Sequence, residues 1–180
     1  MNLLNKEELQ KYIIELVNNG HEPKFYKKYS RVIAVQGKEG EVVETIMADG
    51  HVETVNSVKK DENGNCDWII TNPSGERYIV PNKTFVKKYE IEVGEDGKHA
   101  PKGAPIKAVQ IEDDISFMAS WGELMNIKAG GYLNISDKDD IYGIQENEFN
   151  ETYAKCDKFG IFYDAQLREA FGQNVADEKQ

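Results

Sequence analysis

A spaced set of aromatic residues occurs twice in the chain and limits what it can fold into. Each ring of the first set has an aromatic counterpart 64 residues further on, without a gap: Trp68 and Tyr132, Tyr78 and Tyr142, Phe85 and Phe149, Tyr89 and Tyr153. The triplet Ala-Val-Gln also occurs twice, at 34–36 and at 108–110. A fixed aromatic register in two places favours a duplicated supersecondary unit over chance similarity.

The spacing within each set has a packing explanation. A Phe and a Tyr four residues apart lie on one face of a short helix. A Tyr on a preceding strand lies where that face meets a sheet. Burial of each ring contributes about 1.5–3 kcal/mol. The pattern therefore predicts a short helix held against a sheet twice, at 81–90 and at 145–153.

The opening of the chain has the pattern of an amphipathic helix. Its apolar positions fall at helical spacing and form one stripe: Leu9, Tyr12, Ile13, Leu16 and Val17. Asn5 and Glu8 stand in capping-box positions, and Asn18-Asn19-Gly20 ends the pattern. The stripe is interpreted as a face that docks on the rest of the fold, with a partner-binding helix as the alternative.

Strand patterns fill most of the remaining chain. In the first copy, strand-like runs lie at 32–36, on both sides of the Asp49-Gly50 turn, and at 66–80. In the second copy, strands are expected at 106–111 and within 130–144, whereas the stretch 113–126 is interpreted as a helix. Another helix is expected after position 158.

These patterns together predict an α+β protein. It is expected to be a tandem duplication of a small antiparallel-sheet unit with short helices, plus N- and C-terminal helices. The predicted segments are an N-terminal helix (1–21), a first α+β unit (22–93), a linker (94–104), a second α+β unit (105–154), and a C-terminal helix and tail (155–180).

Composition and cysteine content indicate a cytoplasmic protein. The apolar fraction of 39% suffices for a core, and no apolar run approaches the roughly 20 residues that span a bilayer. The opening residues lack the features of a signal peptide. Cys66 and Cys156 are far apart in sequence, so free buried thiols are favoured over a disulfide.

The charge distribution bears on the class of partner. The net charge is −10, of which the first 93 residues carry −2. A general nucleic-acid binder is disfavoured, because binding phosphates requires an excess of basic residues. Lys83, Lys87 and Lys88 still form a basic group on the first short helix, whereas the second short helix carries glutamates. The lysines are interpreted as a face for an anionic partner, as a docking face between copies or chains, or as a solvated surface.

Two stretches resemble a known family. "YKKYSRVIAVQ" (26–36) and "APKGAPIKAVQI" (100–111) resemble the opening of a family of small phage and bacterial proteins named for a Pro-Gly-Asp-Tyr-Gly motif. "CDWIITNPSGERYIVPNKTFVKKYE" (66–90) and "GGYLNISDKDDIYGIQENEFNETY" (130–153) are similar to its second part. Departures are Gly131 in place of the Asp, Cys66 in place of the Gly, and Trp68 in place of the Tyr. The resemblance implies a phage or prophage context, with no catalytic residue to carry over.

Motifs for catalysis or metal binding are absent from the sequence. His21, His51 and His99 have no second ligand at metal-binding spacing. The stretch 61–72 begins like a calcium loop but lacks the Gly and Glu that such a loop needs. There is no phosphate-binding loop and no nucleophile elbow. No catalytic residue, metal or cofactor is therefore predicted.

The favoured function is that of a non-catalytic binding or interaction protein of phage or mobile-element type, whose ligand is a protein or a small anion. One alternative is an enzyme with a site between the two units, where Trp68, Trp121 and Tyr132 stack on a substrate. The other is a nucleic-acid-binding accessory protein that uses Lys83, Lys87 and Lys88. Membrane binding is not expected, and the sequence leaves the oligomeric state open.

Overall fold

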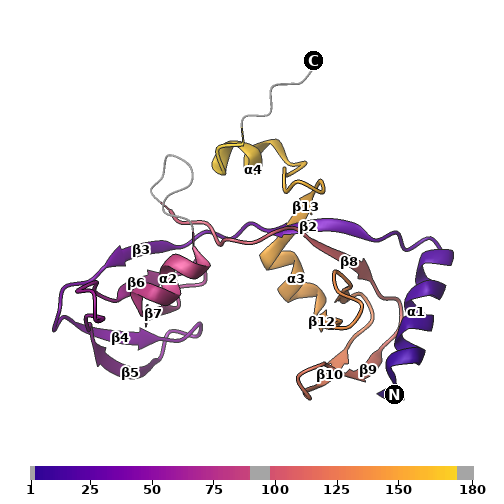
Figure 1. Cartoon of the computed structure of the whole chain (residues 1–180), viewed down its shortest axis with the longest axis horizontal. Coiled ribbons are helices and arrows are strands. Elements are labelled where there is room, and N and C mark those ends of the chain that lie inside the picture. The colour runs from indigo at the N-terminus through magenta and orange to yellow at the C-terminus, as the bar shows by residue number, and fades with distance from the viewer. Residues whose placement is uncertain (1–2, 90–97, 174–180) are drawn as a thin grey trace. The chain divides into compact units, whose positions relative to one another are not determined.

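The computed structural model describes residues 3–89 and 98–173, and it divides the chain into two compact units (Figure 1). Unit 1 contains residues up to Lys28 together with Ala104–Asp164, and unit 2 contains Tyr29–Gly103 together with the residues from Ala165 onward. Each unit is therefore built from two separate stretches of chain.

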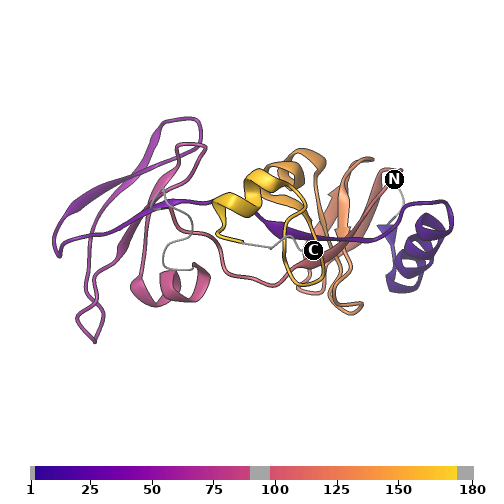
Figure 2. The ribbon, with the colours of Figure 1, turned by 90° about the horizontal axis from the view of Figure 1, so that it is seen from above.

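Unit 1 is centred on a five-stranded antiparallel sheet. Its strands, in spatial order, are β12 (Tyr142–Ile144), β11 (Tyr132–Asn134), β8 (Ile106–Gln110), β2 (Lys24–Lys28) and β13 (Tyr153–Cys156). Helix α1 (Lys6–Asn18) and helix α3 (Glu146–Thr152) lie on opposite sides of this sheet (Figures 1 and 2). The sheet is thus covered by a helix on each face.

A second, three-stranded sheet belongs to the same unit. Strand β9 (Ile115–Met118) pairs in parallel with β1 (Leu3–Leu4) and antiparallel with β10 (Leu124–Ile127). Gly122 makes the turn between β9 and β10 with a φ of 90°, a conformation that costs glycine little.

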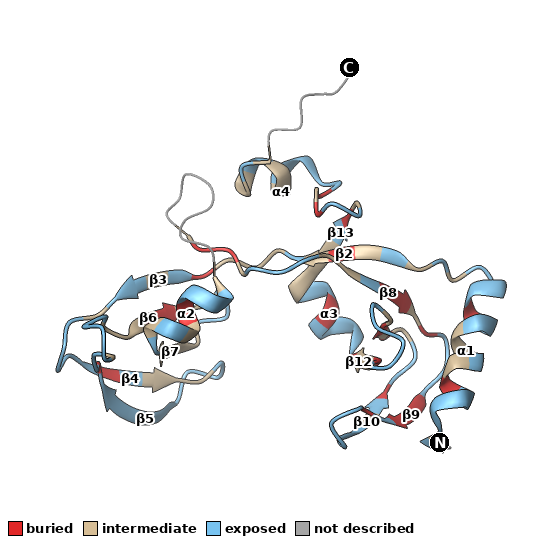
Figure 3. Cartoon of the chain, in the orientation of Figure 1, coloured by how far each residue is buried: buried red, intermediate tan, exposed pale blue. Residues whose placement is uncertain are grey.

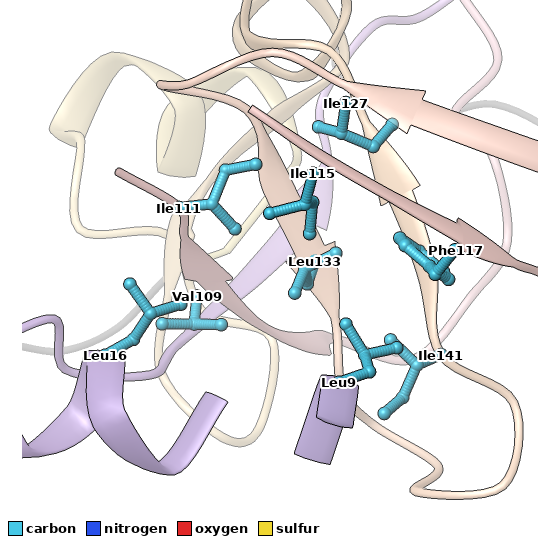
Figure 4. Close-up of a cluster of buried hydrophobic side chains, with 9 residues drawn as sticks. All are labelled: Leu9, Leu16, Val109, Ile111, Ile115, Phe117, Ile127, Leu133 and Ile141. Carbon is cyan, nitrogen blue, oxygen red and sulfur yellow. The ribbon is translucent and has the colours of Figure 1, made fainter. Parts of the chain in front are cut away.

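The capping box and the apolar stripe predicted for the first helix are both present. The Asn5 side chain accepts a hydrogen bond from the Glu8 backbone, and the Glu8 carboxylate accepts one from the Asn5 backbone. Leu9 and Leu16, two turns apart, are buried in the main core of unit 1 (Figure 4). Their buried neighbours come from the strands: Val109, Ile111, Ile115, Phe117, Ile127, Leu133 and Ile141.

Unit 2 is built on another five-stranded antiparallel sheet. Its strands, in spatial order, are β3 (Ile33–Gln36), β6 (Trp68–Thr71), β7 (Arg77–Val80), β4 (Val42–Ile46) and β5 (Val52–Ser57). The predicted hairpin around Asp49-Gly50 is confirmed as β4–β5, and Gly50 has a φ of 91°. Helix α2 (Asn82–Lys88) packs on this unit, which also contains the short helix α4 (Ala165–Ala170).

Two small cores lie on opposite faces of the unit 2 sheet. On the α2 side, Val32, Ile70 and Phe85 are buried together. On the other side, Val43, Val58 and Ile69 form a second cluster. The two clusters use alternate residues of β6, as the period of a strand requires. All of β5 is exposed at the edge of the sheet (Figure 3).

One helix prediction is wrong, and another gives too long a helix. The stretch 113–126 forms β9 and β10 rather than a helix, because Ile115 and Phe117 alternate into the core and a glycine turn reverses the chain. Up to residue 173, the C-terminal segment forms the predicted helix only as the six-residue α4, which is preceded by a turn in which the Asp157 side chain accepts hydrogen bonds from the backbone. Phe159 is 77% exposed there while Phe162 is buried, so these rings do not share one helical face. The predicted tail at 174–180 lies outside the described residues.

The predicted linker is wrong for its second half. Residues 94–97 lie outside the described residues, but His99 and Ala100 are 4% and 1% exposed. His99 forms an antiparallel β-bridge with Val32, and Pro101 forms one with Tyr89, so residues 98–101 are part of unit 2. The mixed α+β class is confirmed, with three sheets of mostly antiparallel strands. Within the described residues, no helix has the length and apolar content needed to cross a membrane.

Candidate functional site

The repeated aromatic residues form a stack in each unit. In unit 1, Phe149 of α3 is 1% exposed and lies between two parallel rings, with centroid distances of 3.8 Å to Tyr132 and 5.0 Å to Tyr153. Tyr26 of β2 meets the same ring edge-on at 4.8 Å. Burial raises the pKa of Tyr26 to about 12, as expected for a phenol held in an apolar cluster.

The stack in unit 2 has the same arrangement. Phe85 of α2 is 2% exposed, stacks on Trp68 at 4.0 Å and on Tyr89 at 5.3 Å, and meets His99 edge-on at 5.3 Å. A histidine therefore stands where unit 1 has a tyrosine. Trp68, Phe85 and Tyr89 follow the repeat, and His99 does not belong to it.

Hydrogen bonds around the two stacks also correspond. The Gln36 side chain donates to the Cys66 carbonyl at 3.1 Å, and the Gln110 side chain donates to the Gly130 carbonyl at 2.9 Å. Each unit also joins two tyrosines by a side-chain hydrogen bond: Tyr78 with Tyr89, and Tyr142 with Tyr153. Matched positions thus have matched partners in the two units.

The strand registers agree as well. In unit 2, Gln36 lies opposite Trp68, and Trp68 lies opposite Val80. In unit 1, the corresponding residues of β8, β11 and β12 are paired in the same way: Gln110 with Tyr132, and Tyr132 with Ile144. A one-residue slip would exchange the faces of a strand, so this agreement places equivalent side chains on equivalent faces.

One departure from the family motif has a steric reason. A Cβ atom at Gly131 would lie 2.5 Å from the Ile127 side chain and 3.0 Å from the Ile144 carbonyl oxygen. An aspartate fits there only if the Ile127 side chain and the nearby backbone shift. Asp67, the equivalent residue of unit 2, has room, and its carboxylate accepts a hydrogen bond from the Lys59 backbone at 2.9 Å.

Trp68 and Tyr132, proposed as ligand-stacking residues, are half-buried and already stack on helix phenylalanines. The Trp68 indole N–H donates to the Asn82 side chain at 2.9 Å. The two rings belong to different units, and a ligand-binding role for them stays a prediction.

The three lysines lie on α2, and all are exposed. Lys83 is hydrogen-bonded to the Glu62 carboxylate, and this partner raises the pKa of Lys83. Lys87 and Lys88 lie in the last turn of the helix, where positive charge is favourable. Their role in binding an anion also stays a prediction.

Trp121 lies on a more prominent apolar surface, which sequence reasoning identified only in part. It is 56% exposed in the turn between β9 and β10. Met118 and Leu124 lie directly opposite each other at the ends of these strands, and both are 52% exposed. Leu3 of β1 is 55% exposed and pairs with the same outer side of β9. We call Leu3, Met118, Trp121 and Leu124 the hairpin surface.

Strand alternation explains why these side chains point outward. Ile115 and Phe117 of β9 point into the core of unit 1, so Met118 points to the outer face. Leu4 packs against the core while Leu3 does not. A strand interpretation of 113–126 would have predicted this surface from the sequence, whereas the helix interpretation concealed it.

Acidic residues border the hairpin surface. Ser120, next to Trp121, donates a hydrogen bond to the Asp140 carboxylate. Glu123 is exposed in the same turn. Asp139 is paired with Lys6 at 2.8 Å, close in sequence to Leu3. Two carboxylates, those of Asp140 and Glu123, therefore lie near the turn that carries Trp121, while the charge of Asp139 is paired with Lys6.

Neither cysteine forms a disulfide, which confirms the prediction of free thiols. Cys156 is buried, and burial raises its pKa to about 11. Cys66 is half-buried. Among the residues that the structure describes, no three His, Cys, Asp or Glu side chains gather as a metal site would need.

Comparison with known proteins gave one finding. The family model described as "PGDYG protein" matches residues 59–154, slightly more than half of the chain. It is a single match that begins between β5 and β6 of unit 2 and ends within β13 of unit 1, so it does not show two tandem copies. No curated protein and no solved structure matches the chain.

Proposed function

Because the chain belongs to the PGDYG protein family, whose function is unknown, we propose from its own surface that it is a non-catalytic interaction protein. It binds a protein partner through the hairpin surface of unit 1. The observation that carries this proposal is the presence of Met118, Trp121 and Leu124, all more than half exposed, at the turn end of one hairpin.

An exposed group of large apolar side chains is costly unless a partner covers it. Single exposed apolar residues are common on monomers, but contiguous patches usually mark binding sites. Tryptophan and methionine are also enriched at protein interfaces. Met118 and Leu124 are adjacent across a strand pair, and Trp121 lies in the turn that joins their strands, where its ring also meets Tyr142 at 6.0 Å.

The border of the surface supports a partner that carries a basic group. Asp140 and Glu123 are carboxylates beside an exposed indole ring. A tryptophan face attracts lysine or arginine, and nearby carboxylates strengthen that preference. The expected partner is therefore a protein segment that presents apolar side chains together with a basic one.

The experiment is photo-crosslinking from defined positions. A benzoylphenylalanine residue is placed at Met118 or Trp121, and the protein is irradiated in lysate of the cells that encode it. We expect a discrete protein adduct from both positions. Leu124→Glu, which places a carboxylate within the apolar surface, should abolish this adduct.

Phe159 provides the matched control, because it is an aromatic residue of the same unit with 77% exposure. A crosslinker at Phe159 should give no such adduct. Equal labelling from Phe159, or no adduct from Met118 and Trp121, would refute the proposed surface. An adduct that consists of two copies of this chain would instead identify the surface as a self-association site and contradict a distinct partner.

The scaffold that carries this surface is, in our proposal, an internal duplication. It is supported by the shared aromatic stacks, by the equal strand registers, and by the matching glutamine hydrogen bonds in the two units. Independent origins would need all three similarities to arise separately. The duplicated unit provides the frame, and the hairpins inserted after β3 and β8 differ between the units.

A phage or mobile-element origin and a cytoplasmic location remain predictions that come from the sequence. The nucleic-acid alternative predicts salt-sensitive binding that weakens when Lys83, Lys87 and Lys88 become Glu. The enzyme alternative predicts turnover of a small substrate that one substitution abolishes. The exposed hairpin surface favours neither of them.

A further inference from the structure

One strand of each sheet comes from an unexpected part of the chain. In unit 1, β2 lies between β8 and β13 and pairs with both. Tyr26 lies opposite Ile106, and Lys28 lies opposite Tyr153. Without β2, strands β8 and β13 would not be connected in the sheet.

In unit 2, residues 99–101 occupy the corresponding position. His99 pairs with Val32, which directly precedes β3, and Pro101 pairs with Tyr89, which directly follows α2. Val32 corresponds to Ile106, and Tyr89 corresponds to Tyr153. In both units the two contacts are therefore made by residues two positions apart on one strand.

The rings on these strands have the same role. Tyr26 meets Phe149 edge-on at 4.8 Å and Tyr132 at 5.8 Å. His99 meets Phe85 edge-on at 5.3 Å and Trp68 at 5.8 Å. Each strand inserts one flat ring against the stack of its unit.

The connectivity of the two strands is crossed. β2 leads through residues 29–31 directly into the first strand of unit 2, yet it pairs in unit 1. Residues 98–101 lead through 102–105 directly into β8 of unit 1, yet they pair in unit 2. A connection of three to four residues is long enough for a hairpin. Each of the two strands could therefore pair with the next strand in sequence, but it pairs in the other unit instead.

We infer that the chain contains a reciprocal strand exchange. In it, β2 and residues 98–101 are equivalent strands, and each completes the sheet of the unit that does not contain the next strand in sequence. The inference rests on the duplicated scaffold proposed above. It assigns to each unit a strand-acceptor site, between β8 and β13 in unit 1 and between Val32 and Tyr89 in unit 2. The ligand of such a site is a strand with a flat ring at its central position.

A second copy of this chain is a partner that fits the acceptor sites, because its exchanged strands have the required sequence. Exchange of an identical element between copies makes few new demands on the structure. Within one chain the strands are held at a high effective concentration, which favours the intramolecular form. Two copies would form the same contacts when they fold at high protein concentration.

Competition between two disulfides tests the inference. Phe25 lies opposite Cys156 in the exchanged pairing. In an unexchanged hairpin it would lie opposite Ile33, the equivalent of Lys107, which is its partner on β8. The test protein is Phe25→Cys, Ile33→Cys and Cys66→Ser with the native Cys156. Directly opposite residues of antiparallel strands are close enough for a disulfide.

Oxidation of the folded protein followed by peptide mapping should give the 25–156 disulfide. The same linkage between two chains would also support the inference and would identify the exchanged dimer. A 25–33 disulfide, or a Cys156 that stays free while the protein is folded, would overturn it. Crosslinking from the hairpin surface does not depend on this result, so the failure of either proposal is recognised separately.

A second measurement avoids substitutions in the strands. A site for a specific protease is placed within 90–97, and the folded chain is cleaved there. Strand exchange, together with the packing of α1 and β1 on the rest of unit 1, predicts that the two fragments elute together on a sizing column and separate only in denaturant. Fragments that separate under native conditions would contradict the exchange even if the disulfide variant failed to fold.

Discussion

Truncation of the two central phenylalanines is the most informative test of how the units are stabilised. Phe149 and Phe85 are 1% and 2% exposed, and each contacts three other rings. Replacement of a buried Phe by Ala costs about 3–5 kcal/mol, because apolar burial is lost and a cavity remains. Loss of aromatic pairs, about 0.5–1.5 kcal/mol each, places the expected cost in the upper part of that range.

The assay is denaturant unfolding followed through the two tryptophans. Trp121 reports on unit 1 and Trp68 on unit 2, so single-tryptophan backgrounds (Trp68→Phe or Trp121→Phe) separate the signals. We expect Phe149→Ala and Phe85→Ala to reduce the free energy of unfolding by similar amounts. Because the exchanged strands couple the units, the transition of the unsubstituted unit should also move to lower denaturant concentration.

Phe159→Ala is the control, since this ring is 77% exposed and its loss should change stability by less than about 0.5 kcal/mol. A cost below about 1 kcal/mol for either buried phenylalanine would refute the argument that these rings hold their helices on the sheets. Strongly unequal costs would refute the equivalence of the two stacks.

Three further outcomes follow from the structure. A thiol reagent should modify Cys66 well before Cys156 in the folded protein, because Cys156 is buried and its pKa is raised to about 11; equal rates in native buffer would contradict the packing of β13. Stability should be complete below pH 10 and fall as the pH rises toward 12, since the pKa of Tyr26 and that of Tyr153 are raised to about 12 in the folded state; an unfolding free energy that stays constant across this range would contradict the burial of these phenols. Asn5→Ala should cost about 1 kcal/mol in thermal unfolding through loss of the capping box, and Asn5→Asp should retain most of it.

Local patterns predicted the elements that local physics controls. The capping box of α1, the turn at Gly50 and the two short helices all follow from residues close together in sequence. The structure of the stretch 113–126 was not predicted correctly, because its apolar residues fit both a helix and a pair of strands. Burial of Ile115 and Phe117 in the core of unit 1 decides for strands.

The exchanged strands could not be predicted from the sequence. A strand next to its neighbour in the chain is the simplest interpretation, and it would have paired β2 with β3. The observed pairing of β2 depends on contacts between residues far apart in sequence, such as Tyr26 with Ile106 and Lys28 with Tyr153. His99 therefore looked like an isolated surface residue, although it is buried against Phe85. The half-burial of Trp68 and Tyr132 could not be predicted from the sequence either, because it results from their packing in the assembled stacks.

Nuclear Overhauser effects between assigned rings test the central claim most directly, because they need no substitution. Strand exchange predicts contacts between the rings of Phe149 and Tyr26 and between those of Phe85 and His99, whose centroids are 4.8 Å and 5.3 Å apart. Contacts of Phe85 with Tyr26 and of Phe149 with His99 would instead show that each half keeps its own strand, and would contradict the exchange.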